Sequence, residues 1–273
     1  MKLEKVKALC FSPTGATAKV AEELSKALSG EFKLPLEYYS FTRPLERDRG
    51  YSFTQTDIVV VASPTYAGKL PNKILPDFRA KLHGNGALAV PVVTFGNRSY
   101  DNSLAELCAV LEENGFRIAA AGAFVCRHAF TDELAYGRPG WSDGFEMKSF
   151  AKRVAQKVSR LSDAVPPLKV PGDANAPYYV PKGLDGNPAQ FLKAKPQTNL
   201  KRCNGCGACI KMCPMGAIDP KDASKVPGTC IKCQACVRKC TKQAKYFDDP
   251  AFLSHVAMLE ANFAEPKENE VFL

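Results

Sequence analysis

Eight of the eleven cysteines in this 273-residue chain lie in one short segment and repeat a fixed spacing. The first run, from Cys203 to Cys213, reads C-x2-C-x2-C-x3-C and is followed by Pro214, and a second run of the same spacing extends from Cys230 to Cys240. Thiolates at this spacing coordinate the iron atoms of [4Fe-4S] clusters. Because the two runs are offset by 27 residues, the segment is an internal repeat for which we expect pseudo-two-fold symmetry.

The spacing also predicts which cysteines share a cluster. Three cysteines at intervals of three residues reach corners of one cubane, whereas the fourth cysteine of each run is turned away and binds the other cluster. We therefore predict two clusters: cluster I on Cys203, Cys206, Cys209 and Cys240, and cluster II on Cys230, Cys233, Cys236 and Cys213. Two structural zinc sites are the alternative, although such sites usually combine separated C-x2-C pairs.

The segment around the cysteines resembles the bacterial two-cluster [4Fe-4S] ferredoxins over about fifty residues, including the stretch from Cys213 to Ile218. It departs from them at Thr241, where the family usually has proline, but this change removes no ligand. The segment is also rich in Lys and Arg. We interpret these side chains first as solvated surface that offsets cluster charge, and second as a docking surface for an acidic partner.

Three loops in the N-terminal part are rich in hydroxyl and glycine residues. The first, Ser12 to Thr17, runs directly into a predicted helix, where backbone N–H groups and hydroxyls can bind a phosphate dianion. It lacks the glycine-lysine pair of nucleoside triphosphate loops, and taken alone it could be a simple helix N-cap. The other two loops are Ser63 to Pro71 and Thr94 to Asp101.

The segments around these loops alternate between β-rich and helical patterns, which predicts an α/β fold with crossover helices. We expect helices near residues 15–29, 71–82, 101–114 and 145–162. The expected strands are Val6 to Phe11, Phe32 to Tyr39, Asp57 to Ala62, Ala87 to Phe95 and Arg117 to Cys126. In a doubly wound parallel five-stranded sheet of order 2-1-3-4-5, the three loops meet at the carboxyl edge of the sheet.

Together the loops resemble the flavodoxin family across roughly residues 1 to 162. The resemblance implies an FMN-binding domain whose first loop holds the phosphate, through Ser12, Thr14, Gly15, Ala16 and Thr17. It also implies that the isoalloxazine lies between two groups of residues: Pro64, Thr65, Tyr66, Ala67 and Gly68 on one side, and Thr94, Phe95, Gly96, Asn97, Arg98, Tyr100 and Asp101 on the other. Which aromatic side chain stacks on the ring stays open, since Tyr66 could instead pack within its own loop.

Composition suggests four parts along the chain. We expect a flavodoxin-like domain over residues 1–163, a Pro- and Gly-rich linker over 164–196, a 2[4Fe-4S] ferredoxin domain of α+β type over 197–249, and a C-terminal helix and tail over 250–273. The last part has apolar residues at helical spacing, so the helix should pack on one of the domains. Cys10, Cys108 and Cys126 lie in apolar positions and are expected to be buried structural thiols.

The charge and the termini restrict the partners. The formal net charge of +9 falls to about +3 once two clusters and a flavin phosphate are counted, so it gives no support to nucleic-acid binding.

The N-terminus lacks the apolar region of a secretory signal, and no apolar run approaches the roughly 20 residues that span a bilayer. We therefore expect a cytoplasmic protein without membrane insertion. Three histidines are too few for a flavodiiron metal site.

Both halves together resemble the flavodoxin-ferredoxin fusions, or flavoferredoxins, of anaerobic bacteria and archaea. The resemblance implies an electron-transfer protein that moves electrons between FMN, two [4Fe-4S] clusters and external redox proteins. The alternative is an FMN-dependent reductase of a small organic substrate, fed by its own clusters and gated by the loop from His128 to Trp141. A zinc or nucleic-acid module is a third interpretation. Donor, acceptor, direction of flow and oligomeric state, including a homodimer, stay open.

Overall fold

The computed structural model describes residues 2–161 and 165–273. Its helices are α1 (Ala16–Phe32), α2 (Pro44–Arg47), α3 (Leu75–Lys81), α4 (Ser103–Glu113), α5 (Trp141–Arg160), α6 (Ala208–Met212), α7 (Ala235–Arg238) and α8 (Pro250–Asn262). Its strands are β1 (Lys5–Cys10), β2 (Leu36–Ser40), β3 (Tyr51–Ser52), β4 (Asp57–Pro64), β5 (Leu82–His83), β6 (Leu88–Phe95), β7 (Arg117–Ile118), β8 (Ala121–Val125), β9 (Gln197–Thr198), β10 (Lys245–Tyr246) and β11 (Glu270–Phe272).

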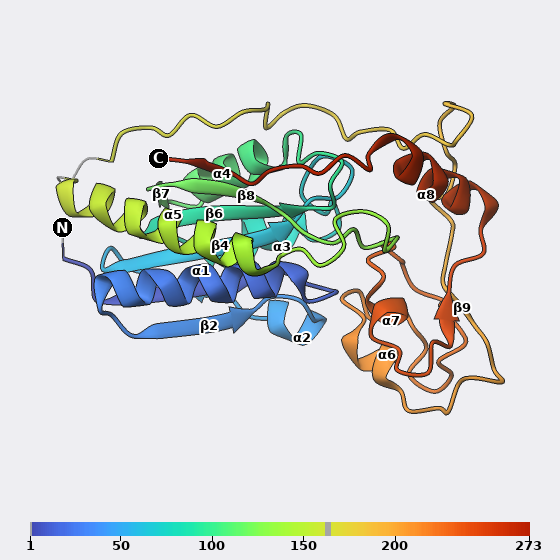
Figure 1. Cartoon of the computed structure of the whole chain (residues 1–273). Coiled ribbons are helices and arrows are strands. Elements are labelled where there is room, and N and C mark those ends of the chain that lie inside the picture. The colour runs from blue at the N-terminus through green and yellow to red at the C-terminus, as the bar shows by residue number, and fades with distance from the viewer. Residues whose placement is uncertain (1, 162–164) are drawn as a thin grey trace.

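The central sheet has the strand order β11-β8-β6-β4-β1-β2, with β7 paired to β6 (Figure 1). All pairings are parallel except β11 with β8, which is antiparallel. Without β11 and the short β7, this is the 2-1-3-4-5 order of the flavodoxin-like fold. The predicted fold class is therefore confirmed.

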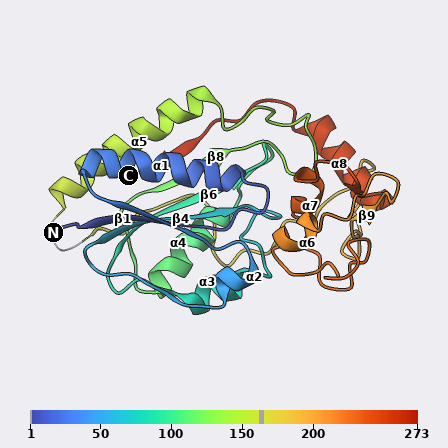
Figure 2. The ribbon, with the colours of Figure 1, turned by 90° about the horizontal axis from the view of Figure 1, so that it is seen from below.

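Alternating side chains along the strands bury both faces of the sheet, as parallel sheets require. In β1, Val6, Ala8 and Cys10 contribute to one hydrophobic cluster, which α1 and α5 cover. Leu9 and the following Phe11 contribute to the opposite cluster, which includes residues of α3 and α4. Figure 2 shows the two helix pairs on opposite sides of the sheet. The three isolated cysteines are buried, as predicted.

Several element boundaries differ from those expected; among them, α3 begins at Leu75 instead of near residue 71. Phe32 ends α1 instead of starting a strand, because it packs with the α1 side of the core, and β2 begins only at Leu36. The last predicted strand is interrupted between β7 and β8. Helix α5 begins at Trp141, four residues earlier than expected.

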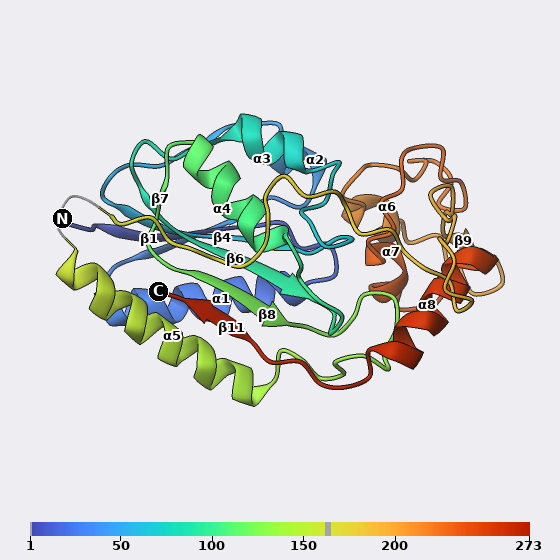
Figure 3. The same cartoon turned by 90° about the horizontal axis from the view of Figure 1, so that it is seen from above.

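The cysteine-containing part lies at the end of the sheet toward which the parallel strands point, in all views (Figure 3). The antiparallel pair β9 and β10 joins its two ends, because β9 precedes the first cysteine and β10 follows the last. The expected helix after Pro250 is present as α8. It packs through Phe252, Met258 and Leu259 against the connector and the loop that follows β8.

The chain after α8 returns to the flavodoxin-like domain and adds β11 to the edge of the sheet. The connector is extended but not detached, since it packs along this domain. The Lys69 ammonium donates to the carbonyl oxygens of Ala174 and Ala176 at 2.8 Å each, and Tyr178 donates to the Leu70 carbonyl at 2.8 Å. Connector and tail therefore tie the two halves together.

Candidate functional site

The two cysteine runs have the same backbone conformation at equivalent positions. Left-handed residues occur in pairs that differ by 27 in number: Gly205 with Lys232, Gly207 with Gln234, and Gly216 with Gln243. Short helices follow the second pair, α6 after Gly207 and α7 after Gln234. Non-glycine residues adopt this conformation only at a cost in strain energy. The expected pseudo-two-fold repeat is thus present in the backbone as well as in the sequence.

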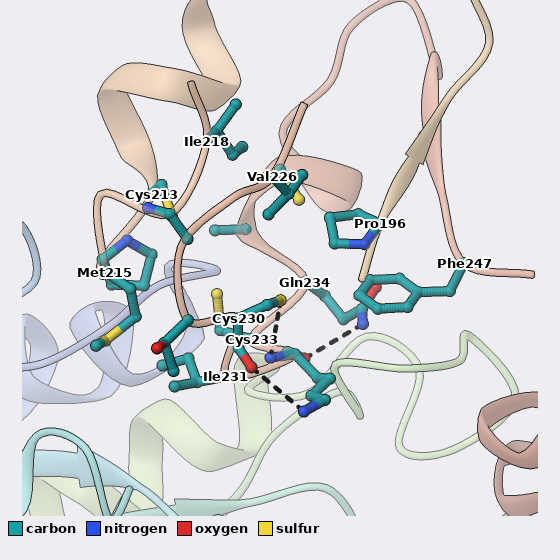
Figure 4. A pocket seen from close by; sticks show the side chains of 16 residues that line it. Pro196, Cys213, Met215, Ile218, Val226, Cys230, Ile231, Cys233, Gln234 and Phe247 are labelled. Carbon is teal, nitrogen blue, oxygen red and sulfur yellow. Dashed lines mark hydrogen bonds between the residues drawn. The ribbon is translucent and has the colours of Figure 1, made fainter. Parts of the chain in front are cut away.

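The four cysteines predicted to bind cluster II line a single pocket (Figure 4). They are Cys213 from the first run and Cys230, Cys233 and Cys236 from the second. Apolar side chains complete the wall: Pro196, Ile218, Val226 and Phe247. Burial raises the pKa of the Cys236 thiol to about 12 and that of the Cys233 thiol still further. Thiolates in this pocket therefore need a bound cation, which fits a metal cluster.

The four cysteines predicted for cluster I are more accessible. Cys206 is exposed, and Cys203, Cys209 and Cys240 are half-buried. The fourth cysteine of each run accepts a backbone N–H bond at 3.3 Å, from Ala217 to the Cys213 sulfur and from Ala244 to the Cys240 sulfur. Such bonds to sulfur tune cluster potentials. Among the described residues, no group of three or more His, Cys, Asp or Glu side chains is arranged to hold a single metal ion.

The first predicted flavin loop presents backbone donors at the start of α1. Gly15 precedes the helix in a left-handed conformation with φ +103°, and the space beside its Cα is open. The Ser12 hydroxyl accepts the Ala18 N–H at 2.9 Å, and the Thr17 hydroxyl bonds that of Thr94 at 2.7 Å. In the described part of the chain, the amides from Thr14 to Thr17 have no protein acceptor. This arrangement of free N–H groups fits a phosphate. Backbone amides provide the free donors here, whereas the hydroxyls of Ser12 and Thr17 bond to protein groups.

The second flavin loop is a tight turn. Tyr66 and Lys69 pair in an antiparallel bridge, and the intervening Ala67 and Gly68 are both left-handed. A Cβ atom on Gly68 would lie 2.3 Å from a carboxylate oxygen of Asp101 in the third loop. The Gly68 carbonyl also accepts the N–H of Asn102 at 2.9 Å. The second and third loops are therefore brought together, as the strand order predicts.

In the third loop, several predicted side chains contact other protein groups. The Asn97 amide donates to the carbonyls of Phe263 and Glu265 at 2.6 and 3.0 Å, so it binds the C-terminal tail. The buried Tyr100 hydroxyl donates to a Glu270 carboxylate oxygen at 2.8 Å. The Arg98 guanidinium lies 4.1 Å from the ring centre of Tyr179 in the connector and pairs with Asp101. Tail and connector thus hold this loop, a role that the loop sequence did not reveal.

The flavin loops meet the cluster II pocket directly. Met215 and Ile231 line that pocket and also pack against the hydrophobic cluster that contains Phe11 and Phe95, at the ends of β1 and β6. Burial, followed by the nearby Cys233 and Cys230 thiolates, raises the pKa of the Tyr66 hydroxyl well above its usual value. Tyr66, within the second predicted flavin loop, therefore lies near Cys230 and Cys233.

Two arginines join the halves: Arg47, which the sequence does not single out, and Arg238, one of the basic residues interpreted above as solvated surface. The buried Arg47 donates to the Pro214 carbonyl at 2.6 Å, beside Cys213, and pairs with Asp77 at 2.7 Å. Arg238 of α7 donates to the carbonyl oxygens of Ala129 and His128 at 2.9 and 3.1 Å. In the sequence, Arg47 ends a short polar stretch and Arg238 lies between Cys236 and Cys240. Neither position by itself indicates an interface.

His128, the first residue of the predicted gating loop, is half-buried in the same region. A Cβ atom on Gly96 would lie 2.3 Å from its ring, so Gly96 permits this packing. The ring Nδ1 accepts the Phe130 N–H at 3.1 Å. Burial lowers the pKa of His128 to about 4, with His255 and Arg238 adding to the effect. His128 is therefore neutral at pH 7.

Comparison with known proteins agrees with this architecture. Residues 195–250 match the 4Fe-4S dicluster domain family. The chain joins a flavodoxin-like fold to this dicluster domain. The matched family is one of iron-sulfur domains. No curated protein sequence matches the chain significantly, and no helix within residues 2–161 and 165–273 is long and apolar enough to cross a membrane.

Three solved structures illustrate the similarity of the N-terminal part. An archaeal flavodoxin is 15% identical with a TM-score of 0.40, covering 57% of this chain and 99% of its own. The FMN-bound flavodoxin of Fusobacterium nucleatum is 11% identical with a TM-score of 0.36, covering 59% and 98%. Rubredoxin:oxygen oxidoreductase from Desulfovibrio gigas is 17% identical with a TM-score of 0.38, covering 58% of this chain but 37% of that one. The fold assignment itself rests on strand order.

Proposed function

We propose that the protein is an electron relay in which FMN, cluster II and cluster I follow one another from the sheet edge to the surface. The observation that carries the proposal is that Met215 and Ile231 belong both to the wall of the cluster II pocket and to the core beside the flavin loops. Side chains of the cluster II pocket and of the predicted flavin loops therefore adjoin one continuous hydrophobic cluster, which supports the proposal. FMN accepts one or two electrons and each cluster accepts one, so the relay would convert between the two kinds of transfer.

The residues have distinct roles in this proposal. The amides from Thr14 to Thr17 would bind the flavin phosphate, and the turn at Tyr66 would border the ring beside cluster II. The crossed cysteine sets would hold two [4Fe-4S] clusters, of which cluster II is enclosed and cluster I is accessible through Cys206. Tail, connector and Arg47 keep the two halves in a fixed arrangement, which an efficient short-range transfer requires.

The alternative, reduction of a small organic substrate at the flavin, depends on a mobile gate near His128. In the structure this loop carries the His128–Arg238 contact, and the Arg138 guanidinium also pairs with Asp143 at 2.6 Å. The Arg238 contact holds the start of this loop against the cysteine-containing part, whereas Gly137, Pro139 and Trp141 at its other end line a pocket beside α1. These contacts favour the relay.

The test is anaerobic reconstitution, assay of flavin, iron and sulfide, and photoreduction of the protein with stopped-flow detection. We expect one flavin phosphate and about eight iron atoms per chain. After photoreduction, electrons should equilibrate between the clusters and the flavin, which is followed by their absorbance bands, at a rate independent of protein concentration. Absence of flavin, or a rate that rises in proportion to protein concentration, would refute an intramolecular relay. A matched variant, Cys206→Ser, should disturb cluster I while leaving flavin content unchanged.

A further inference from the structure

We infer that the cluster I end of the protein is a docking surface for an acidic one-electron redox protein, such as a small ferredoxin of net negative charge. This inference rests on the proposed relay, because it assigns the relay's external partner. The surface, here called the basic face, is defined by five side chains that each lie within two residues of a cluster I cysteine: Lys201, Arg202, Lys211, Lys239 and Lys242.

All five side chains of the basic face are exposed. None has an ion-pair or hydrogen-bond partner in the described part of the chain. The segment from 195 to 250 contains four acidic residues, and all are remote in sequence from the cluster I cysteines: Asp219, Asp222, Asp248 and Asp249. Five cations outweigh the roughly two negative charges of an oxidised cluster with its thiolates. A positive field therefore remains at this end.

The cations near cluster II are used differently. The Lys232 ammonium donates to backbone carbonyls, including that of Cys230 at 3.3 Å, and Lys195 donates to the Val226 carbonyl at 2.6 Å. Lys245 is buried and donates to the Ala223 carbonyl. These side chains stabilise the fold of the domain. Within residues 195–250, the exposed cations without a partner are concentrated around the accessible cluster, with Lys221 as the exception.

The internal repeat shows what the basic face corresponds to. A shift of 27 residues relates Met215 to Lys242, Ile231 to Asn204, and Arg238 to Lys211. The first member of each pair forms the interface with the flavodoxin-like domain. The second lies at the equivalent place on cluster I. In the cluster II half, this face packs permanently against the flavodoxin-like domain. In the cluster I half, the equivalent face is polar, basic and exposed.

This difference indicates the kind of partner. Permanent interfaces are apolar at their centre, whereas transient redox complexes rely on charge complementarity that speeds association. Leu200, which is 72% exposed, adjoins Lys201 two residues after β9, and Tyr246, which is 43% exposed, ends the paired strand β10; both supply apolar surface at this end of the domain. In the transfer, the reduced partner loses one electron and this protein gains it, with no bond or proton exchanged.

The test combines a binding measurement with cross-linking, neither of which depends on activity. Holoprotein is mixed with an acidic 2[4Fe-4S] ferredoxin, and its dissociation constant is measured as salt is varied. Carbodiimide links carboxylates to lysines in contact, so mass spectrometry identifies the surface. The test variant is Lys211→Glu with Lys242→Glu. The control is Lys152→Glu with Arg153→Glu on α5, where both side chains are exposed and the charge change is the same.

We expect cross-links at lysines of the basic face and an affinity that falls with salt. The test variant should bind at least about tenfold more weakly at low salt, with the difference shrinking at about 0.5 M salt as the charges are screened. The control should bind like the wild type. Equal binding by both variants, or cross-links mainly on the flavodoxin-like domain, would overturn the inference. So would tighter salt-dependent binding of DNA or of anionic vesicles than of the ferredoxin.

Failure of the inference is distinguishable from failure of the relay. Photoreduction by a small deazaflavin bypasses the docking surface, so flavin reduction in the test variant should proceed as in the wild type. If that internal transfer persists while docking is unaffected by charge reversal, only the inference is wrong. If internal transfer is missing from the wild type, the relay fails, and the binding data still decide where an acidic partner docks.

Discussion

Replacement of Arg47 by methionine should lower the reduction potential of cluster II and loosen the junction between the two halves. The Arg47 side chain is 7% exposed and donates to the carbonyls of Pro214, Phe41 and Thr42 while pairing with Asp77. Met fills a similar volume but supplies no donor. The buried Pro214 carbonyl then loses a partner, which costs about 1–3 kcal/mol.

The electrostatic effect follows from the position of the guanidinium. Its 2.6 Å bond to Pro214 places it within roughly 10 Å of the sulfur of the preceding Cys213, because one residue of backbone separates the two groups. A unit charge at that distance contributes about 2 kcal/mol at an effective dielectric constant near 20. For a one-electron couple this is roughly 90 mV. We therefore expect the Met variant to have a cluster II potential lower by about 50–90 mV.

The assay is an anaerobic redox titration followed by electron paramagnetic resonance, with a denaturant titration on the same samples. Arg47→Lys separates the two effects, because lysine keeps the charge but cannot span Asp77 and Pro214 together. It should restore most of the potential and little of the stability. Arg153→Met on the exposed face of α5 is the control. A Met variant with a cluster II potential within about 10 mV of wild type and an unchanged denaturation midpoint would refute the reasoning.

Three further predictions concern the individual sites. Gly15→Ala should weaken FMN binding about tenfold or more, because φ +103° is strained for alanine, whereas Gly30→Ala in α1 should not; fluorescence titration decides, and equal affinities would contradict the cradle. Cys213→Ser should disturb the magnetic signal of cluster II and Cys240→Ser that of cluster I, and the reverse assignment would disprove crossed ligands. His128→Gln should make the free energy of unfolding less sensitive to acid. The folded pKa of His128, about 4, lies below the unfolded value near 6.5, so the wild type loses about 2 kcal/mol of stability between pH 7.5 and 5. Equal shifts of the denaturant midpoint with pH in both proteins would contradict this prediction.

Local patterns determined a large part of this protein. The spacing of the cysteines predicted two ligand sets, and one of them lines a single pocket. Alternating apolar runs predicted the parallel sheet, and its 2-1-3-4-5 order places three distant loops at one edge. These features are readable because each depends on residues near in sequence or on one repeated period.

Other features required the tertiary structure. The sequence gives no sign that Asn97 and Tyr100 bind the C-terminal tail, since their partners lie more than 160 residues away. The three-residue β11 is too short to show a strand pattern, and its pairing with β8 depends on an available sheet edge. Arg47 is an ordinary helical arginine until Pro214 packs beside it. The cysteine chemistry follows from local spacing, whereas the position of cluster II beside the flavin loops follows from packing between distant segments.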